Sequence, residues 1–200
     1  RHLLAHASGL PMDGPAPPAP IAKPGTRRIY SNLGFETLAA HLAERAGMPF
    51  AEYLLEAVLL PLNLEHTSLD GSPASGATGP LTDLMALGRE LLSPTLISAE
   101  TLAVGTAVTF PNLAGLLPGF GRQDPNDWGL GFELRDHKAP HWTGTANSPQ
   151  TFGHFGQSGS FLWIDPVAGL SCGSLSDRDF GPWAVEAWPA LSDAVIASYR

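Results

Sequence analysis

Tyr30 and Asn32 stand two residues apart, where an extended stretch meets the start of a helical pattern. Residues two apart on an extended segment point to the same side. A phenol can pass a proton, and an amide can both donate and accept hydrogen bonds. An acyl-transfer site needs both kinds of group beside a nucleophile. Taken alone, the tripeptide Tyr30-Ser31-Asn32 also fits a simpler structure, in which the asparagine caps a helix beside a packed tyrosine.

A glycine-rich segment, residues 153–159 (GHFGQSG), leads into a run of apolar residues. Its glycines would let a substrate or another backbone approach closely, and His154 offers a side chain that changes charge near neutral pH. The same residues also fit a bulged strand start with a hydrogen-bonded histidine. Residues 156–160 imitate a Gly-x-Ser-x-Gly nucleophile elbow, but the last position is Ser160, so Ser158 is not expected to be a nucleophile.

The order of these two motifs resembles that of the penicillin-recognising serine hydrolases, which carry Ser-x-x-Lys, then Tyr-x-Asn, then Lys/His-x-Gly on a strand. The chain is most similar to the group formed by class C β-lactamases, D-alanyl-D-alanine carboxypeptidases and esterases. Longer segments around and between the motifs resemble this family in the same order: RHLLAHASGLP (1–11), PGTRRIYSNLGF (24–35), LLPLNLEHTS (59–68) and FLWIDP (161–166).

The resemblance implies a role for each motif residue. Tyr30 would be the acid/base that helps to activate a serine, Asn32 would orient the acyl group, and His154 would complete the polar network. The backbone N–H of Gln157 matches the family position that forms one half of the oxyanion hole. The other residues implied in oxyanion or substrate binding surround it: Phe155, Gly156 and Ser158.

The nucleophile motif itself is absent from this sequence. There are two lysines, and the residues three positions before them are Pro20 for Lys23 and Arg135 for Lys138, so neither belongs to Ser-x-x-Lys. In the family this motif precedes the segment found here at 1–11. We therefore expect a sequence truncated at its N-terminus and inactive alone. A non-catalytic homologue that binds peptide-like ligands, and a structural or interaction protein, are the alternatives.

Phe155 departs from the family pattern, which often has serine or threonine at that position. A hydroxyl there can hydrogen-bond a substrate carboxylate, whereas a phenyl ring cannot. β-Lactams and D-Ala-D-Ala peptides both present a carboxylate, so Phe155 favours an ester or amide substrate over either. The expected partner is a small-molecule ester, a β-lactam or a peptide.

Hydrophobic spacing predicts the elements that must position these residues. Helical periodicity covers residues 2–7, 32–46, 49–58, a stretch starting near 81 and a stretch starting near 182. Thr82 and Ser98 are expected to cap helices. Strands are expected at 128–135, 160–164 and 170–175, with residues 111–127 as a loop. Helices followed by antiparallel strands and a last helix predict an α+β fold.

The resemblance refines this into one partial β-lactamase/transpeptidase-like domain over residues 1–200. It implies an antiparallel sheet flanked by helices, made from residues 1–32 and 118–200 and incomplete at the N-terminus. It also implies a helical lobe at residues 33–117, with the site between the two parts. Within this fold we expect Trp142 to line the cleft, and Trp183 and Trp188 to pack a helix on the sheet.

Composition excludes some classes of function. The chain has 11 basic and 19 acidic residues and a net charge of −8, so a nucleic-acid partner is not expected. No run reaches the roughly 20 apolar residues of a membrane span. Two histidine pairs, His2/His6 and His137/His141, have i,i+4 spacing but no completing ligands, so neither a metal nor a cofactor is expected. Cytoplasmic and secreted or periplasmic locations are both compatible with the sequence, and oligomeric state is left open.

Overall fold

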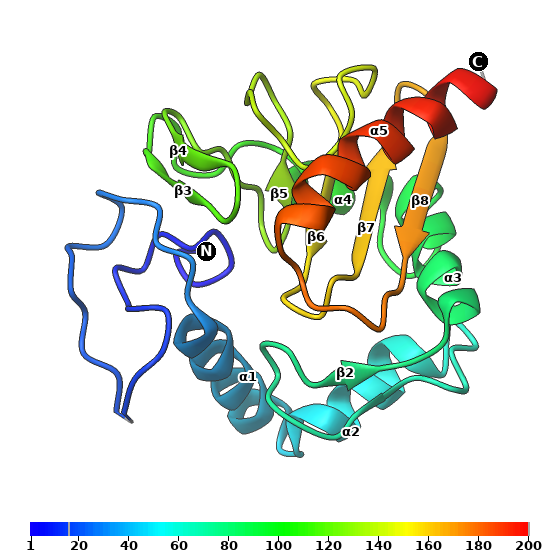
Figure 1. Cartoon of the computed structure of the whole chain (residues 1–200). Helices are drawn as coiled ribbons and strands as arrows, with labels where there is room; N and C mark the ends of the chain where they lie inside the picture. The colour runs from blue at the N-terminus through cyan, green and yellow to red at the C-terminus, as the bar shows by residue number, and fades with distance from the viewer. Residues whose placement is uncertain (16, 200) are drawn as a thin grey trace.

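A four-stranded antiparallel sheet lies at the centre of the computed structural model, which describes residues 1–15 and 17–199. Its strands stand in chain order: β5 (Glu133–Leu134), β6 (Phe152–Phe155), β7 (Phe161–Asp165) and β8 (Leu170–Ser174). Figure 1 shows α5 (Pro182–Ser198) lying across this sheet and α3 (Leu81–Leu92) beside β8. The combination of helices and antiparallel strands confirms the α+β prediction.

The strand β7 explains why helices cover both faces of the sheet. All five of its residues are buried, and successive side chains of a strand point to opposite faces. Phe161 and Trp163 pack into a cluster with Trp188 and Ile196 of α5. Leu162 and its neighbour Ile164 pack instead against leucines of α3, namely Leu84, Leu87 and Leu91. The fully buried indole of Trp163 also donates a hydrogen bond to Ser192 Oγ at 3.1 Å.

The helices before the sheet follow the predicted pattern closely. α1 spans Asn32–Ala46 and ends at Gly47, whose φ of 71° is the left-handed conformation typical of a helix stop. The next predicted helix appears as α2 (Phe50–Leu54) followed by a π-helical turn, η1 (Leu55–Leu59). α4 spans Ala99–Gly105, and Ser98 caps it as expected. No helix of the described residues is long and apolar enough to cross a bilayer.

Two short hairpins complete the chain. β1 (Ser68–Leu69) pairs with β2 (Ala77–Thr78), and β3 (Gly115–Leu117) pairs with β4 (Gly121–Gln123). The second hairpin lies in the region predicted as loop, because each strand has only three residues and glycines obscure the alternation. The division into a helical lobe at 33–117 and a second part stays a prediction.

Besides the predicted loop at 111–127, three other local predictions were wrong. Residues 2–7 form turns instead of a helix, because His6 adopts a left-handed φ of 50°. Thr82 is not a helix cap, since α3 begins directly after Pro80 with no side-chain cap. The predicted strand at 128–135 is interrupted by a turn at Gly131, whose φ is 90°. Trp128 pairs back onto Glu133 across this turn, and only Glu133–Leu134 joins the sheet.

Replacing Trp163 by alanine should lower the free energy of unfolding by about 3–5 kcal/mol, because a large buried side chain leaves a cavity that its neighbours refill only in part. Val167→Ala is the control: its side chain is 66% exposed in the turn after β7, so the cost should stay below about 0.5 kcal/mol. Urea unfolding of the full-length protein, followed by far-UV circular dichroism, measures both. Equal, small effects would contradict the packing described.

Candidate active site

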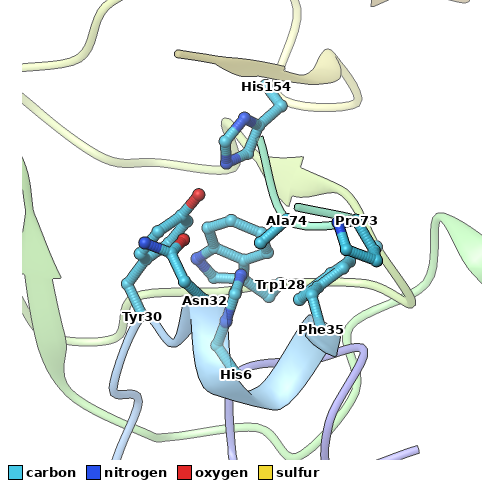
Figure 2. A pocket seen from close by; sticks show the side chains of 9 residues that line it. His6, Tyr30, Asn32, Phe35, Pro73, Ala74, Trp128 and His154 are labelled. Atoms are coloured by element: carbon cyan, nitrogen blue, oxygen red, sulfur yellow. The ribbon is translucent and has the colours of Figure 1, made fainter. Parts of the chain in front are cut away.

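A cavity of about 200 Å³ brings the three candidate catalytic residues together. Tyr30 and Asn32 reach it from the start of α1, and His154 reaches it from β6 (Figure 2). The two segments are more than 120 residues apart in sequence. The complete lining consists of His6, Tyr30, Asn32, Phe35, Pro73, Ala74, Trp128, Gly131 and His154.

The first turn of α1 leaves Asn32 free to face the cavity. Ser31, not Asn32, is the helix cap: its Oγ accepts a hydrogen bond from the Gly34 N–H at 2.9 Å. Asn32 Nδ2 instead donates to the Asp13 carboxylate at 2.9 Å. Tyr30 lies just before the cap and also lines the cavity, as its extended spacing from Asn32 predicts.

His6 packs against this turn. It was not among the predicted site residues. Its Nδ1 accepts a hydrogen bond from the Ser31 N–H at 3.0 Å, so the ring is neutral with its proton on Nε2. The ring is 2% exposed and lies 4.4 Å, centroid to centroid, from both Tyr30 and Trp128. Burial, with His154 and Arg28 nearby, lowers the pKa of His6 to about 3.

His154 completes the polar side of the cavity. Its ring is stacked against Tyr30, with 5.7 Å between centroids, and meets Trp128 edge-on at 5.6 Å. Burial lowers the pKa of His154 to about 4, although the Glu133 carboxylate acts in the opposite direction. His154 is therefore neutral at pH 7 and can offer one donor and one acceptor nitrogen.

Tyr30 is protonated in this environment. Burial raises the pKa of its phenol above 10, and the Asp13 carboxylate raises it further. Neither lysine lines the cavity. Lys138 is buried, and its ammonium donates to the Glu133 carboxylate and to the Asp127 carbonyl, while Lys23 is exposed. A base at Tyr30 would thus need a cation that the described residues do not place there.

Phe155 and Trp142 face away from the cavity. Alternation along β6 directs Phe155 to the α5 side, where its ring lies 5.5 Å from Trp188 and 4.8 Å from Phe180. Trp142 is 1% exposed, and its indole N–H donates to Glu133 at 2.8 Å. The expectation that Trp142 lines the cleft was wrong. Trp128 lines it instead, whereas Trp188 packs α5 on the sheet as expected.

The turn from β6 to β7 carries Gly156, Gln157 and Ser158. The Gly156 N–H donates to the Ser160 carbonyl at 2.9 Å, and the Gln157 carbonyl accepts from the Phe180 N–H at 2.8 Å. The N–H of Gln157 donates to no group among the described residues. Ser158 is exposed and forms no hydrogen bond with His154. Within the described part of the chain, no group of three His, Cys, Asp or Glu side chains could hold a metal ion.

A family model described as Beta-lactamase matches residues 1–195. The chain belongs to the beta-lactamase family. A solved beta-lactamase structure from Mycobacterium bovis is 54% identical, with a TM-score of 0.95, and the match covers 100% of this chain and 73% of that chain. The likeness confirms the β-lactamase/transpeptidase-like fold and the resemblance to penicillin-recognising hydrolases.

More distant relatives share the fold. Simvastatin synthase (LovD) from Aspergillus terreus aligns at 18% identity with a TM-score of 0.76, covering 100% of this chain and 67% of that chain. A curated relative in Escherichia coli (strain K12), whose name is that of a D-alanyl-D-alanine carboxypeptidase, is 23% identical over 91% of this chain. The present chain spans 57% of the length of that curated relative.

Because of the two neutral histidines of this beta-lactamase-family site, the free energy of unfolding should fall as the pH is lowered below 6.5. Their folded pKa values of about 3 and 4 lie below the ordinary 6.5, so the unfolded chain binds more protons as the pH falls from 6.5 towards 4. Stability is then present above pH 6.5 and is lost below it, by about 1 kcal/mol per pH unit for each histidine.

His154→Gln should remove its share of this slope in urea unfolding of the full-length protein between pH 7 and pH 4. The control is His137→Gln, since the His137 side chain is 84% exposed and outside the cavity; it should leave the slope unchanged. A slope that both variants reduce equally would contradict a neutral, half-buried His154.

Proposed function

We propose that this chain supplies most of the active site of a serine hydrolase that forms an acyl-enzyme with an uncharged carboxylic ester. The observation that carries the proposal is the convergence of Tyr30, Asn32 and His154 on a single cavity, in a chain of the beta-lactamase family. These residues supply the acid/base, donor and acceptor groups that acyl transfer requires.

The attacking serine would come from a Ser-x-x-Lys segment of the whole protein that this sequence does not contain. The raised pKa of Tyr30 supports this part of the proposal, since a phenol that keeps its own proton at neutral pH cannot accept the serine proton. The ammonium of that lysine, placed beside Tyr30, would favour the phenolate by Coulomb attraction. The 200-residue chain alone would therefore be inactive.

The other groups would hold the acyl group and its developing charge. Asn32 has its Nδ2 on Asp13, which leaves Oδ1 as an acceptor towards the cavity. His154, neutral at pH 7, would complete the network beside Tyr30. The N–H of Gln157, which donates to no group among the described residues, would be one of the two oxyanion donors, and loss of such a donor typically costs roughly 10²–10³ in rate.

The cavity-lining residues of this chain offer no cation for a substrate carboxylate, which favours an uncharged substrate; the lysine of the missing segment would be paired with Tyr30. None of the nine lining residues is a lysine or an arginine, and both lining histidines are neutral at pH 7. A carboxylate on the substrate would also approach Asp13, whose carboxylate contacts Asn32. Phe155 does not bear on this preference, because its ring packs against α5 and does not line the cavity.

β-Lactam hydrolysis is the second candidate, because the solved protein that is 54% identical carries the name beta-lactamase. It would use the same acyl-enzyme chemistry on a cyclic amide. Turnover of p-nitrophenyl acetate and of nitrocefin by the full-length protein separates the two candidates. Preferential nitrocefin turnover would overturn the ester assignment, and turnover of neither would favour a non-catalytic, ligand-binding homologue.

Tyr30→Phe in the full-length protein should lower kcat for the preferred substrate by about 10²–10⁴, the usual contribution of a positioned acid/base. Tyr53→Phe, on α2 and outside the cavity, is the matched control and should retain activity. Measured steady-state kinetics that are equal for the two variants would contradict the role of Tyr30. Turnover by the 200-residue chain alone would contradict its inactivity.

A further inference from the structure

The side of the cavity opposite Tyr30 and Asn32 is apolar. It is formed by Phe35, at the end of the first turn of α1, and by Pro73 and Ala74, from the loop that joins β1 to β2. Figure 2 shows Pro73 and Phe35 on the opposite side of the view from Tyr30, with Ala74 and the indole of Trp128 lying between the two sides. The cavity thus has a reactive side and an apolar side.

The apolar side is built by an ordered loop. The chain turns back at Ser72, whose carbonyl accepts hydrogen bonds from the N–H groups of Ser75 at 3.0 Å and of Gly76 at 2.6 Å. The two ends of the loop touch: a Cβ on Gly76 would lie 2.6 Å from the backbone of Gly71. Only a residue without a side chain fits there, so the loop is held closed by its own backbone.

A side-chain hydrogen bond ties this loop to the helix that begins at the site. Ser72 Oγ donates to Glu36 Oε1 on α1 at 2.7 Å. Glu36 follows Phe35 directly and lies one helical turn beyond Asn32. The position of Pro73 and Ala74 is therefore fixed relative to the same helix that presents Asn32 and Phe35 to the cavity.

We propose that the β1–β2 loop, through Ala74, limits the length of the acyl chain that the enzyme accepts. This inference rests on the proposed ester hydrolase function. With the ester carbonyl beside Tyr30 and Asn32, the acyl chain extends towards Phe35, Pro73 and Ala74. The cavity of about 200 Å³ is smaller than the roughly 300–1,000 Å³ of sites for drug-sized ligands. The substrate class is accordingly short-chain esters.

The test is the acyl-length preference of Ala74→Phe in the full-length protein, measured with p-nitrophenyl acetate, butyrate and hexanoate. The larger side chain should lower kcat/KM for hexanoate by about ten-fold or more and leave acetate within about three-fold of the wild type, a typical range for a few methylenes in an apolar pocket. Ala77→Phe is the matched control, because Ala77 is exposed on β2 and outside the cavity.

Two further measurements keep the proposal testable if Ala74→Phe does not fold or if no ester is turned over. Ala74→Gly, which enlarges the cavity, should shift the preference towards hexanoate. Binding of p-nitrophenyl ethyl ether and hexyl ether, which cannot be hydrolysed, can be followed by isothermal titration calorimetry. The Kd of the hexyl ether should rise about ten-fold in Ala74→Phe, with that of the ethyl ether nearly unchanged.

These outcomes separate the two proposals. An enzyme that binds the ethers with the expected Ala74 dependence but turns over no ester would refute the proposed function and keep the loop as the length-limiting wall. Equal effects of Ala74→Phe on short and long chains, equal effects of Ala77→Phe, or no binding of either ether would overturn the inference about the loop.

Discussion

The guanidinium of Arg28 joins segments that are otherwise far apart in the chain, and the geometry of the site depends on it. Its nitrogens donate to the backbone carbonyls of Ala5, Thr109, Phe110 and Asn126. The residue is 4% exposed, and no carboxylate of the described residues forms a salt bridge with it. The four carbonyl hydrogen bonds therefore offset the free-energy cost of burying the charge. Burial lowers the pKa of Arg28 only to about 10, so it remains charged at pH 7.

This buried charge holds two other segments, those of His6 and Trp128, beside the segment that carries Tyr30. Ala5 directly precedes His6, whose ring accepts the Ser31 N–H, and Asn126 lies two residues before Trp128. Arg28 itself lies two residues before Tyr30. Since polar groups inside a protein are costly when unpaired, each of these segments has one favourable position, and the cavity takes its shape from them.

The side chains that line the site are uncharged at pH 7. This bears on both the proposed nucleophile and the proposed substrate. Both histidines are uncharged, Tyr30 keeps its proton, and the lysine that is buried pairs with Glu133. Such a site has little attraction for an anionic substrate. With the histidine pKa values lowered and the Tyr30 phenol protonated, the site offers only weak bases for a serine proton at neutral pH. The proposed mechanism therefore uses a lysine from another segment.

The sequence predicted much of this arrangement because its strongest signals are local. The bounds of α1, the hairpin of β7 and β8, and the shared side of Tyr30 and Asn32 all follow from periodicity and caps. His6 and Trp128 were missed because turns with positive φ, at His6 and Gly131, carry them to the cavity. The direction of Phe155 could have been predicted, since adjacent residues of a strand face opposite sides.

In the proposed mechanism, Tyr30 helps to activate a serine that lies outside residues 1–200. Labelling the full-length protein with a fluorophosphonate, followed by mass spectrometry of its peptides, tests this most directly. One labelled serine is expected, three residues before a lysine and outside this sequence, with labelling at least about 10²-fold slower in Tyr30→Phe. A label on Ser158 or on any other serine of this chain, or a rate that Tyr30→Phe does not change, would contradict it.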